Sequence, residues 1–253
     1  MNTPSSVTPV KVSKLRPRSL QQLRSWDRRV YFVITLILIG LVAKGFWPSY
    51  YGPLVSGPAA PRPWVMHLHA AIFTGWMLLL LLQVLLIAVG RVAAHRRVGT
   101  IGIGYGVLVF AIGMVVSFTA PIAHIQAGEW SLDRGAGFMI FPLVDMILFA
   151  GFFGGAVVYR RNLEAHKRLM LAATVALAFA AVARMGIEPL VLFYLVWISP
   201  MLVGVGFDLI SRRRVHPVYL ISLTAMTVAF PRILLLESEA WLRIGRALLT
   251  PFL

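Results

Sequence analysis

The residues of this sequence with the most chemical potential are ionisable side chains inside long apolar runs. Asp145 stands in "FPLVDMILFA", Arg184 in "AVARMG" and Arg232 in "AFPRIL". An ionisable group inside a membrane-spanning segment costs roughly 2.5–3.5 kcal/mol on insertion scales. Such a residue therefore indicates either an ion pair that fixes helix packing or a functional site. Together with Glu188 and His69, these residues form a charge-balanced set. They predict an ion pair that fixes helix packing, a site for an anionic or quinone-like ligand, or a proton path.

The depth of Asp145 makes an arginine partner necessary. At about 1.5 Å per residue the carboxylate lies on the order of 12 Å from the outer end of its helix, too deep for a short side chain to reach the headgroups. An unpaired carboxylate at that depth would be protonated or strongly destabilising. We expect its partner to be Arg184.

Two histidines stand in the stretch "WVMHLHAAIFTGW". His67 and His69 are about 200° apart around a helix, so only one of them can face the interior of a bundle. Helical steps from His69 lead through Trp76 to Gln83, which carry polar atoms, so His69 is the interior candidate and His67 belongs at the rim. His69 is either a satisfied interfacial histidine or a ligand or proton carrier.

Three further histidines form a second candidate site. His95, His166 and His216 each begin an apolar run, in "HRR", "HKR" and "HP", and therefore share a depth at the inner face. Three imidazoles could bind a divalent metal and leave a coordination position open. The alternative is that each imidazole lies in the headgroup zone beside Arg, Lys or Pro without binding a metal.

The elements that must position these residues are membrane helices. Hydrophobic residues make up 59% of the 253-residue chain and charged residues 13%, and the mean hydropathy is +0.82. A soluble domain of this size could not bury so much apolar surface in one core. The absence of cysteine excludes disulfides and thiolate metal ligands. The sequence predicts an all-α, polytopic integral membrane helix bundle.

About seven apolar runs are long enough to cross a bilayer, and "MGIEPL" between the fifth and sixth predicts a tight outer turn or a kink. Lys and Arg gather in the N-terminal tail, "GRVAAHRR", "YRRNLEAHKR" and "SRRR", which places the N-terminus inside and the C-terminus outside. We expect a basic tail with a short interfacial helix over 1–29, and a short outer interfacial helix over 237–253. The spans occupy 30–236 and are expected near 30–48, 64–90, 99–120, 137–159, 167–186, 188–210 and 217–236.

The chain resembles a bacterial family of multi-span membrane proteins of unknown function. The resemblance rests on "HLHAAIFTGW" followed by Gln83, on the boundaries "HRRVG" and "EAHKRLM", and on "FDLISRRRVHP". It covers most of the chain and implies the membrane-bundle fold. More distantly, the strings resemble b-type cytochromes and cytochrome-oxidase-assembly membrane proteins, which implies haem b or a metal. The histidine pairs that such cytochromes carry on one helix are missing here.

Two functions stand open. The first is a non-catalytic membrane protein, either a small transporter or a subunit or assembly factor with a membrane-protein partner, whose polar core includes His69, Asp145 and Arg184. The alternative is a redox protein that holds haem b through His69 and His124, or a divalent metal through the inner histidines.

The basic residues that give the chain its net charge of +15 lie in the tail and loops between the spans. This placement predicts anionic lipid on the cytoplasmic face of a cell inner (plasma) membrane, and excludes nucleic acid.

Overall fold

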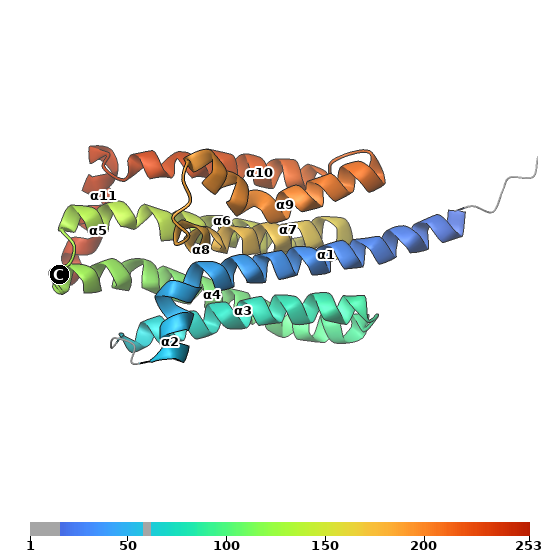
Figure 1. Ribbon diagram of the computed structural model, residues 1–253, viewed down its shortest axis with the longest axis horizontal. Helices are drawn as coiled ribbons and strands as arrows, with labels where there is room; N and C mark the ends of the chain where they lie inside the picture. Colours follow the sequence, from blue (N-terminus) through green and yellow to red (C-terminus); the bar gives the residue numbers. More distant parts are fainter. Residues whose placement is uncertain (1–15, 58–61) are drawn as a thin grey trace, which may run out of the picture.

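The computed structural model describes residues 16–57 and 62–253, and the side chains from residue 26 onward. Within this part of the chain, seven helical segments are long and apolar enough to cross a membrane. They lie side by side along the long axis of the molecule (Figure 1). The predicted all-α polytopic bundle is confirmed, and the chain is a multi-pass membrane protein.

The elements follow one another through short connections, as expected for neighbouring helices in a bundle. In chain order they are α1 (Arg16–Phe46), the π-helical turn η1 (Trp47–Tyr51), α2 (Gly52–Ser56), α3 (Trp64–Ala88), α4 (Val92–Gln126), α5 (Leu132–Phe138), α6 (Ile140–Val158), α7 (Leu163–Leu177), α8 (Phe179–Ala183), α9 (Leu190–Arg212), α10 (Pro217–Ala229), the 3-10 turn η2 (Phe230–Leu235), α11 (Glu239–Leu249) and the 3-10 turn η3 (Thr250–Phe252).

We call the end of the bundle that carries the N-terminus the inner end, following the predicted orientation, and the opposite end the outer end. Residues 1–15 of the expected basic tail lie outside the described residues. From Arg16 the chain forms one continuous helix of 31 residues rather than a separate short helix followed by a span. α1 therefore extends beyond the rest of the bundle at the inner end (Figure 1).

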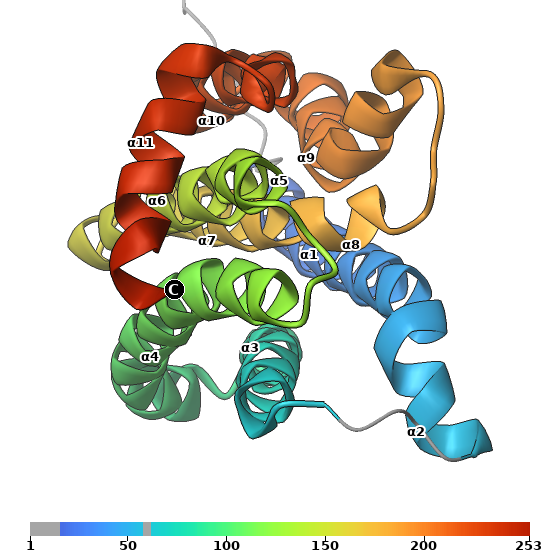
Figure 2. The same ribbon diagram turned by 90° about the vertical axis from the view of Figure 1, so that its left-hand side faces the viewer.

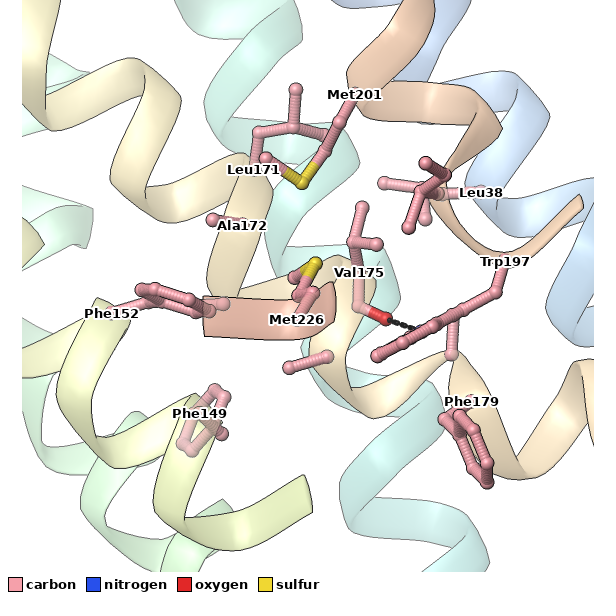
Figure 3. Close-up of a cluster of buried hydrophobic side chains, with 14 of the residues drawn as sticks. Leu38, Phe149, Phe152, Leu171, Ala172, Val175, Phe179, Trp197, Met201 and Met226 are labelled. Carbon is pink, nitrogen blue, oxygen red and sulfur yellow. Dashed lines mark hydrogen bonds between the residues drawn. The ribbon is translucent and has the colours of Figure 1, made fainter. Parts of the chain in front are cut away.

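The core is built around α7. Its span, Leu163–Ala183, has 67% of its most apolar window buried, against 17% for the span formed by α3. Small residues such as Ala172 and Ala176 let the neighbouring helices approach α7 closely. Figure 3 shows side chains from α6, α9 and α10 meeting there, and the indole of Trp197 donates a hydrogen bond of 2.8 Å to the carbonyl oxygen of Val175.

The fifth and sixth spans are separate helices joined by an outer turn. α8 ends at Ala183 and α9 begins at Leu190. Gly186 adopts a φ of 61°, a left-handed conformation that suits glycine, and the Glu188–Pro189 peptide is cis. Of the two expected alternatives, the tight outer turn is the one observed.

The expected helix after the last span is α11, which crosses the outer end of the bundle from α10 toward α4 (Figure 2). Its inward face packs on α5, where Trp241 Nε1 donates a 2.9 Å hydrogen bond to the carbonyl oxygen of Ala136. Leu242, Gly245 and Leu249 are buried, whereas Ile244 is 53% exposed. α11 therefore packs one side on the bundle and leaves an apolar side chain facing the surroundings, and its place in the outer interface stays a prediction.

Candidate ligand groove and buried ion pairs

Asp145 of α6 forms an ion pair with Arg232 of η2. Arg232 Nη2 donates a hydrogen bond to Asp145 Oδ1, and each residue is only 4% exposed. The expected arginine partner is present, but it is Arg232 and not Arg184. The pair joins the outer halves of two helices that are far apart in the sequence.

The local sequence explains how Arg232 reaches the interior. Pro231 cannot donate a backbone hydrogen bond, and α10 ends at Ala229, where the chain tightens into η2. The guanidinium carbon of Arg232 lies 4.1 Å above the ring of Phe179, 5.7 Å from Phe141 and 5.9 Å from Trp197. Stabilisation of a cation by aromatic faces uses no N–H group. Arg232 Nε and Nη1 are buried and have no hydrogen-bond partner within the described chain.

A groove of about 370 Å³ lies beside Arg232, between α6 and the C-terminal end of α10 with η2. It opens onto the lipid-facing surface, because Val228 and Leu234 on its wall are each 75% exposed. The residue after η2 packs closely on α5, where a Cβ atom on Gly137 would stand 2.5 Å from the carbonyl oxygen of Leu236. The lining consists of apolar side chains with one exception, Arg232: Ile140, Val144, Val228, Ala229, Pro231, Arg232, Leu234 and Leu235.

The other residues of the predicted outer site do not join this pair. His69 is half-buried, and its Nδ1 has no hydrogen-bond partner among the described residues. His67 is exposed and its Nδ1 lies 3.0 Å from the hydroxyl oxygen of Tyr50, so the expected division between an interior and a rim histidine is confirmed. Trp76 is buried in the core, where its indole donates a 3.3 Å hydrogen bond to Thr174 Oγ1.

Arg184 and Glu188 lie at the surface of the outer turn. Arg184 donates a 2.8 Å hydrogen bond to the carbonyl oxygen of Ala180, and its guanidinium carbon lies 4.6 Å above the ring of Phe46. Glu188 is exposed. The predicted outer cluster thus divides into a buried pair, a core tryptophan, the histidine of α3 and two surface residues.

Two of the three inner histidines bind backbone groups at helix ends, and the third, His95, binds the side chain of Gln83. In the orientation of the Gln83 amide that satisfies its neighbours, its nitrogen donates to His95 Nδ1 at 2.8 Å. His166 Nδ1 lies 2.8 Å from the carbonyl oxygen of Ala156, in the last turn of α6. His216 Nδ1 accepts a 3.2 Å hydrogen bond from the backbone N–H of Val218 and caps α10. The described residues contain no group of three or more His, Asp or Glu placed to hold a metal, so the predicted metal site does not assemble here.

The inner ends of α1, α7 and α9 are joined by a network that the sequence analysis missed. We call it the inner ion network. At its centre Arg168, which is fully buried, donates from Nε and Nη2 to the two carboxylate oxygens of Asp208 at 3.2 and 2.5 Å. Its Nη1 donates to Glu164 Oε2 at 2.6 Å. The network contains three acids and three bases and is neutral: Asp27, Glu164, Asp208, Lys167, Arg168 and Arg212.

Two tyrosines extend the inner ion network into the bundle. Arg168 lies 5.2 Å from the ring centre of Tyr219, whose hydroxyl oxygen is 3.1 Å from that of Tyr31. Gly204 of α9 permits this arrangement, because a Cβ atom there would stand 1.9 Å from the Tyr219 hydroxyl oxygen. α10 is thereby connected to α1 as well.

A pattern in the sequence could have predicted the inner ion network. Glu164 precedes Arg168 by one helical turn, and Asp208 precedes Arg212 in the same way, so opposite charges line one face of two span ends. Charges at span ends are also typical of the headgroup zone, so this spacing alone does not distinguish a buried network from solvated helix ends.

Comparison of the chain with protein-family models, with curated proteins and with solved structures gives no match.

Proposed function

We propose that the protein is a non-catalytic membrane protein that binds an amphipathic molecule of the bilayer in the groove beside Arg232. The observation that carries this proposal is Arg232, which lines an otherwise apolar groove and has two buried nitrogen atoms with no hydrogen-bond partner among the described residues. Such binding suits a small transporter, or a subunit that presents its ligand to a larger complex. A bacterial inner membrane is the proposed location.

The groove has the composition of a site for a small amphiphile. Ligand pockets are mostly apolar and contain a few polar groups that fix orientation, and their volumes run from roughly 300 Å³ upward. Here the apolar walls accept a hydrocarbon tail, and Arg232 offers hydrogen bonds to an acceptor on the head. Entry is lateral, from the lipid, because the exposed wall of Val228 and Leu234 faces outward.

The proposal is tested by filling the groove. Ala229→Trp and Val144→Trp would occupy it from opposite walls and leave the Asp145–Arg232 pair in place. Val115→Trp is the matched control, because Val115 is a 45% exposed residue on α4, outside the groove. We expect native mass spectrometry to find an amphiphile bound to the wild type and to the control, and lost from both groove variants. Equal retention by all four proteins would reject the proposal.

We also propose that the inner face contacts anionic lipid. The inner ion network uses the described inner acids Asp27, Glu164 and Asp208. Exposed arginines remain at the inner end with no ion-pair partner among the described residues, and each attracts an anionic headgroup by about 1 kcal/mol near the surface. They are Arg28, Arg29, Arg91, Arg96, Arg97, Arg160, Arg161, Arg213 and Arg214. Stronger binding to vesicles that contain phosphatidylglycerol than to phosphatidylcholine vesicles, abolished by added salt, would support this contact. Equal binding would reject it.

A further inference from the structure

We infer that the groove beside Arg232 selects a neutral carbonyl compound with an apolar tail, such as a quinone, over an anionic phospholipid. This inference rests on the proposed function, because it names the class of ligand for the same groove. Its basis is the charge already present at the site.

The site is neutral before any ligand enters. Asp145 balances the charge of Arg232, and each of the two residues is only 4% exposed. An anionic headgroup beside this pair would leave one uncompensated negative charge in an apolar environment, which is strongly unfavourable. A neutral acceptor adds no charge and can still accept hydrogen bonds.

The nitrogen atoms of Arg232 suit a neutral ligand that accepts hydrogen bonds. Nε and Nη1 are covered and have no hydrogen-bond partner among the described residues, so a small turn of the side chain toward the groove would let them donate to a carbonyl oxygen. Phe141, Phe179 and Trp197 lie behind the guanidinium at 4.1 to 5.9 Å and hold it in place without using its N–H groups. The tail of the ligand would run along the apolar wall formed by Val228 and Leu234 into the bilayer.

The experiment compares two probes in nanodiscs of phosphatidylcholine. One probe is a short-chain ubiquinone analogue and the other is phosphatidylglycerol of similar tail length, and each is titrated against the purified full chain by native mass spectrometry. We expect the quinone to bind the wild type at least about tenfold more tightly than phosphatidylglycerol. The groove variant Ala229→Trp should lose the quinone, whereas the control Val115→Trp should keep it.

The variant Asp145→Asn tests the charge directly, because it leaves Arg232 with an uncompensated positive charge. We expect the preference to shift toward phosphatidylglycerol by about tenfold or more. If the variant does not fold, the comparison in the wild type still decides. Tighter binding of phosphatidylglycerol by the wild type would overturn the inference and leave the proposed function standing. Failure of both probes, with no native amphiphile retained, would overturn both.

Discussion

At the scale of single residues, Arg232 combines a paired charge with two nitrogen atoms that have no hydrogen-bond partner among the described residues. Asp145 was predicted from the sequence to need an arginine, because depth in a span follows from counting residues. Its partner could not be predicted, because the choice between Arg184 and Arg232 depends on how each helix is rotated and on where Pro231 ends α10. The contacts of His166 and His216 with helix ends likewise depend on loop geometry.

Removing one partner of the buried Asp145–Arg232 pair should cost far more stability than removing both partners. Asp145→Asn leaves a buried guanidinium uncompensated and should lower the free energy of unfolding by about 3–5 kcal/mol. The double variant Asp145→Leu with Arg232→Leu should lose less, because no charge remains buried. Asp133→Asn, which disrupts the exposed pair with Arg246, is the control and should change little. Unfolding in detergent, followed by circular dichroism, measures all three, and a double variant less stable than Asp145→Asn would contradict the account.

His216 should make stability depend on pH. Burial, assisted by the nearby Arg168, lowers the pKa of His216, with smaller opposing effects from Asp208 and Glu164. The folded state therefore binds a proton less readily than the unfolded chain, so stability is intact above the ordinary histidine pKa of about 6.5 and falls as the pH drops below it. Protonation also removes the Nδ1 acceptor that caps α10.

His216→Asn isolates this effect, because asparagine caps helices well and does not titrate. We expect the thermal midpoint of the wild type to fall more steeply than that of the variant between about pH 7 and pH 5. Identical slopes would show that His216 does not contribute to the pH dependence.

At the scale of elements, glycines decide how closely helices meet. α1 contacts α8 at Gly45, where an added Cβ atom would stand 2.1 Å from the carbonyl oxygen of Ala181. A backbone atom cannot rotate away as a side chain can. Gly40, one helical turn or so earlier on α1, has nothing within 4 Å of the same position.

Alanine at these two glycines should therefore act in opposite directions. Gly45→Ala should separate α1 from α8 and cost about 1–3 kcal/mol, as overpacking does. Gly40→Ala should stabilise α1 by up to about 1 kcal/mol, because alanine is the better helix former. Thermal unfolding of the two variants gives the comparison, and similar destabilisation by both would argue against a close α1–α8 contact.

The existence and approximate bounds of the spans were predictable, because about 20 consecutive apolar residues are needed to cross a bilayer. The length of α4 was not predictable: the expected span ended near residue 120, whereas the helix extends to Gln126. Pro121 lies inside this helix. A membrane helix can continue past a proline when neighbouring helices pack against it, and the sequence does not reveal that packing.

At the scale of the whole molecule, the arrangement assigns different roles to the two ends. The inner end is held by the neutral inner ion network across α1, α7 and α9. The outer end contains the Asp145–Arg232 pair, the groove beside it and the crossing helix α11 (Figure 2). The sequence predicted the polar groups of the outer half, but not that they would divide, because their meeting depends on contacts between distant helices.

The orientation on which these names depend is itself testable. The basic connections between α3 and α4, α6 and α7, and α9 and α10 predict a cytoplasmic N-terminus and an external C-terminus. Reporter fusions that are active on only one side of the membrane should give opposite results at the two ends. Equal activity at both ends would reject the seven-span topology.

The most direct measurement of the central claim is photo-crosslinking in native membranes from within the groove. A photoreactive amino acid at Val228, which lines the groove, is compared with one at Ile221, which lies on the same helix, outside the groove, and is similarly exposed at 65% against 75%. We predict an adduct of one mass class at Val228, lost when Ala229→Trp fills the groove, and no such adduct at Ile221. The same mixture of lipid adducts at both positions, unchanged by Ala229→Trp, would contradict ligand binding in the groove.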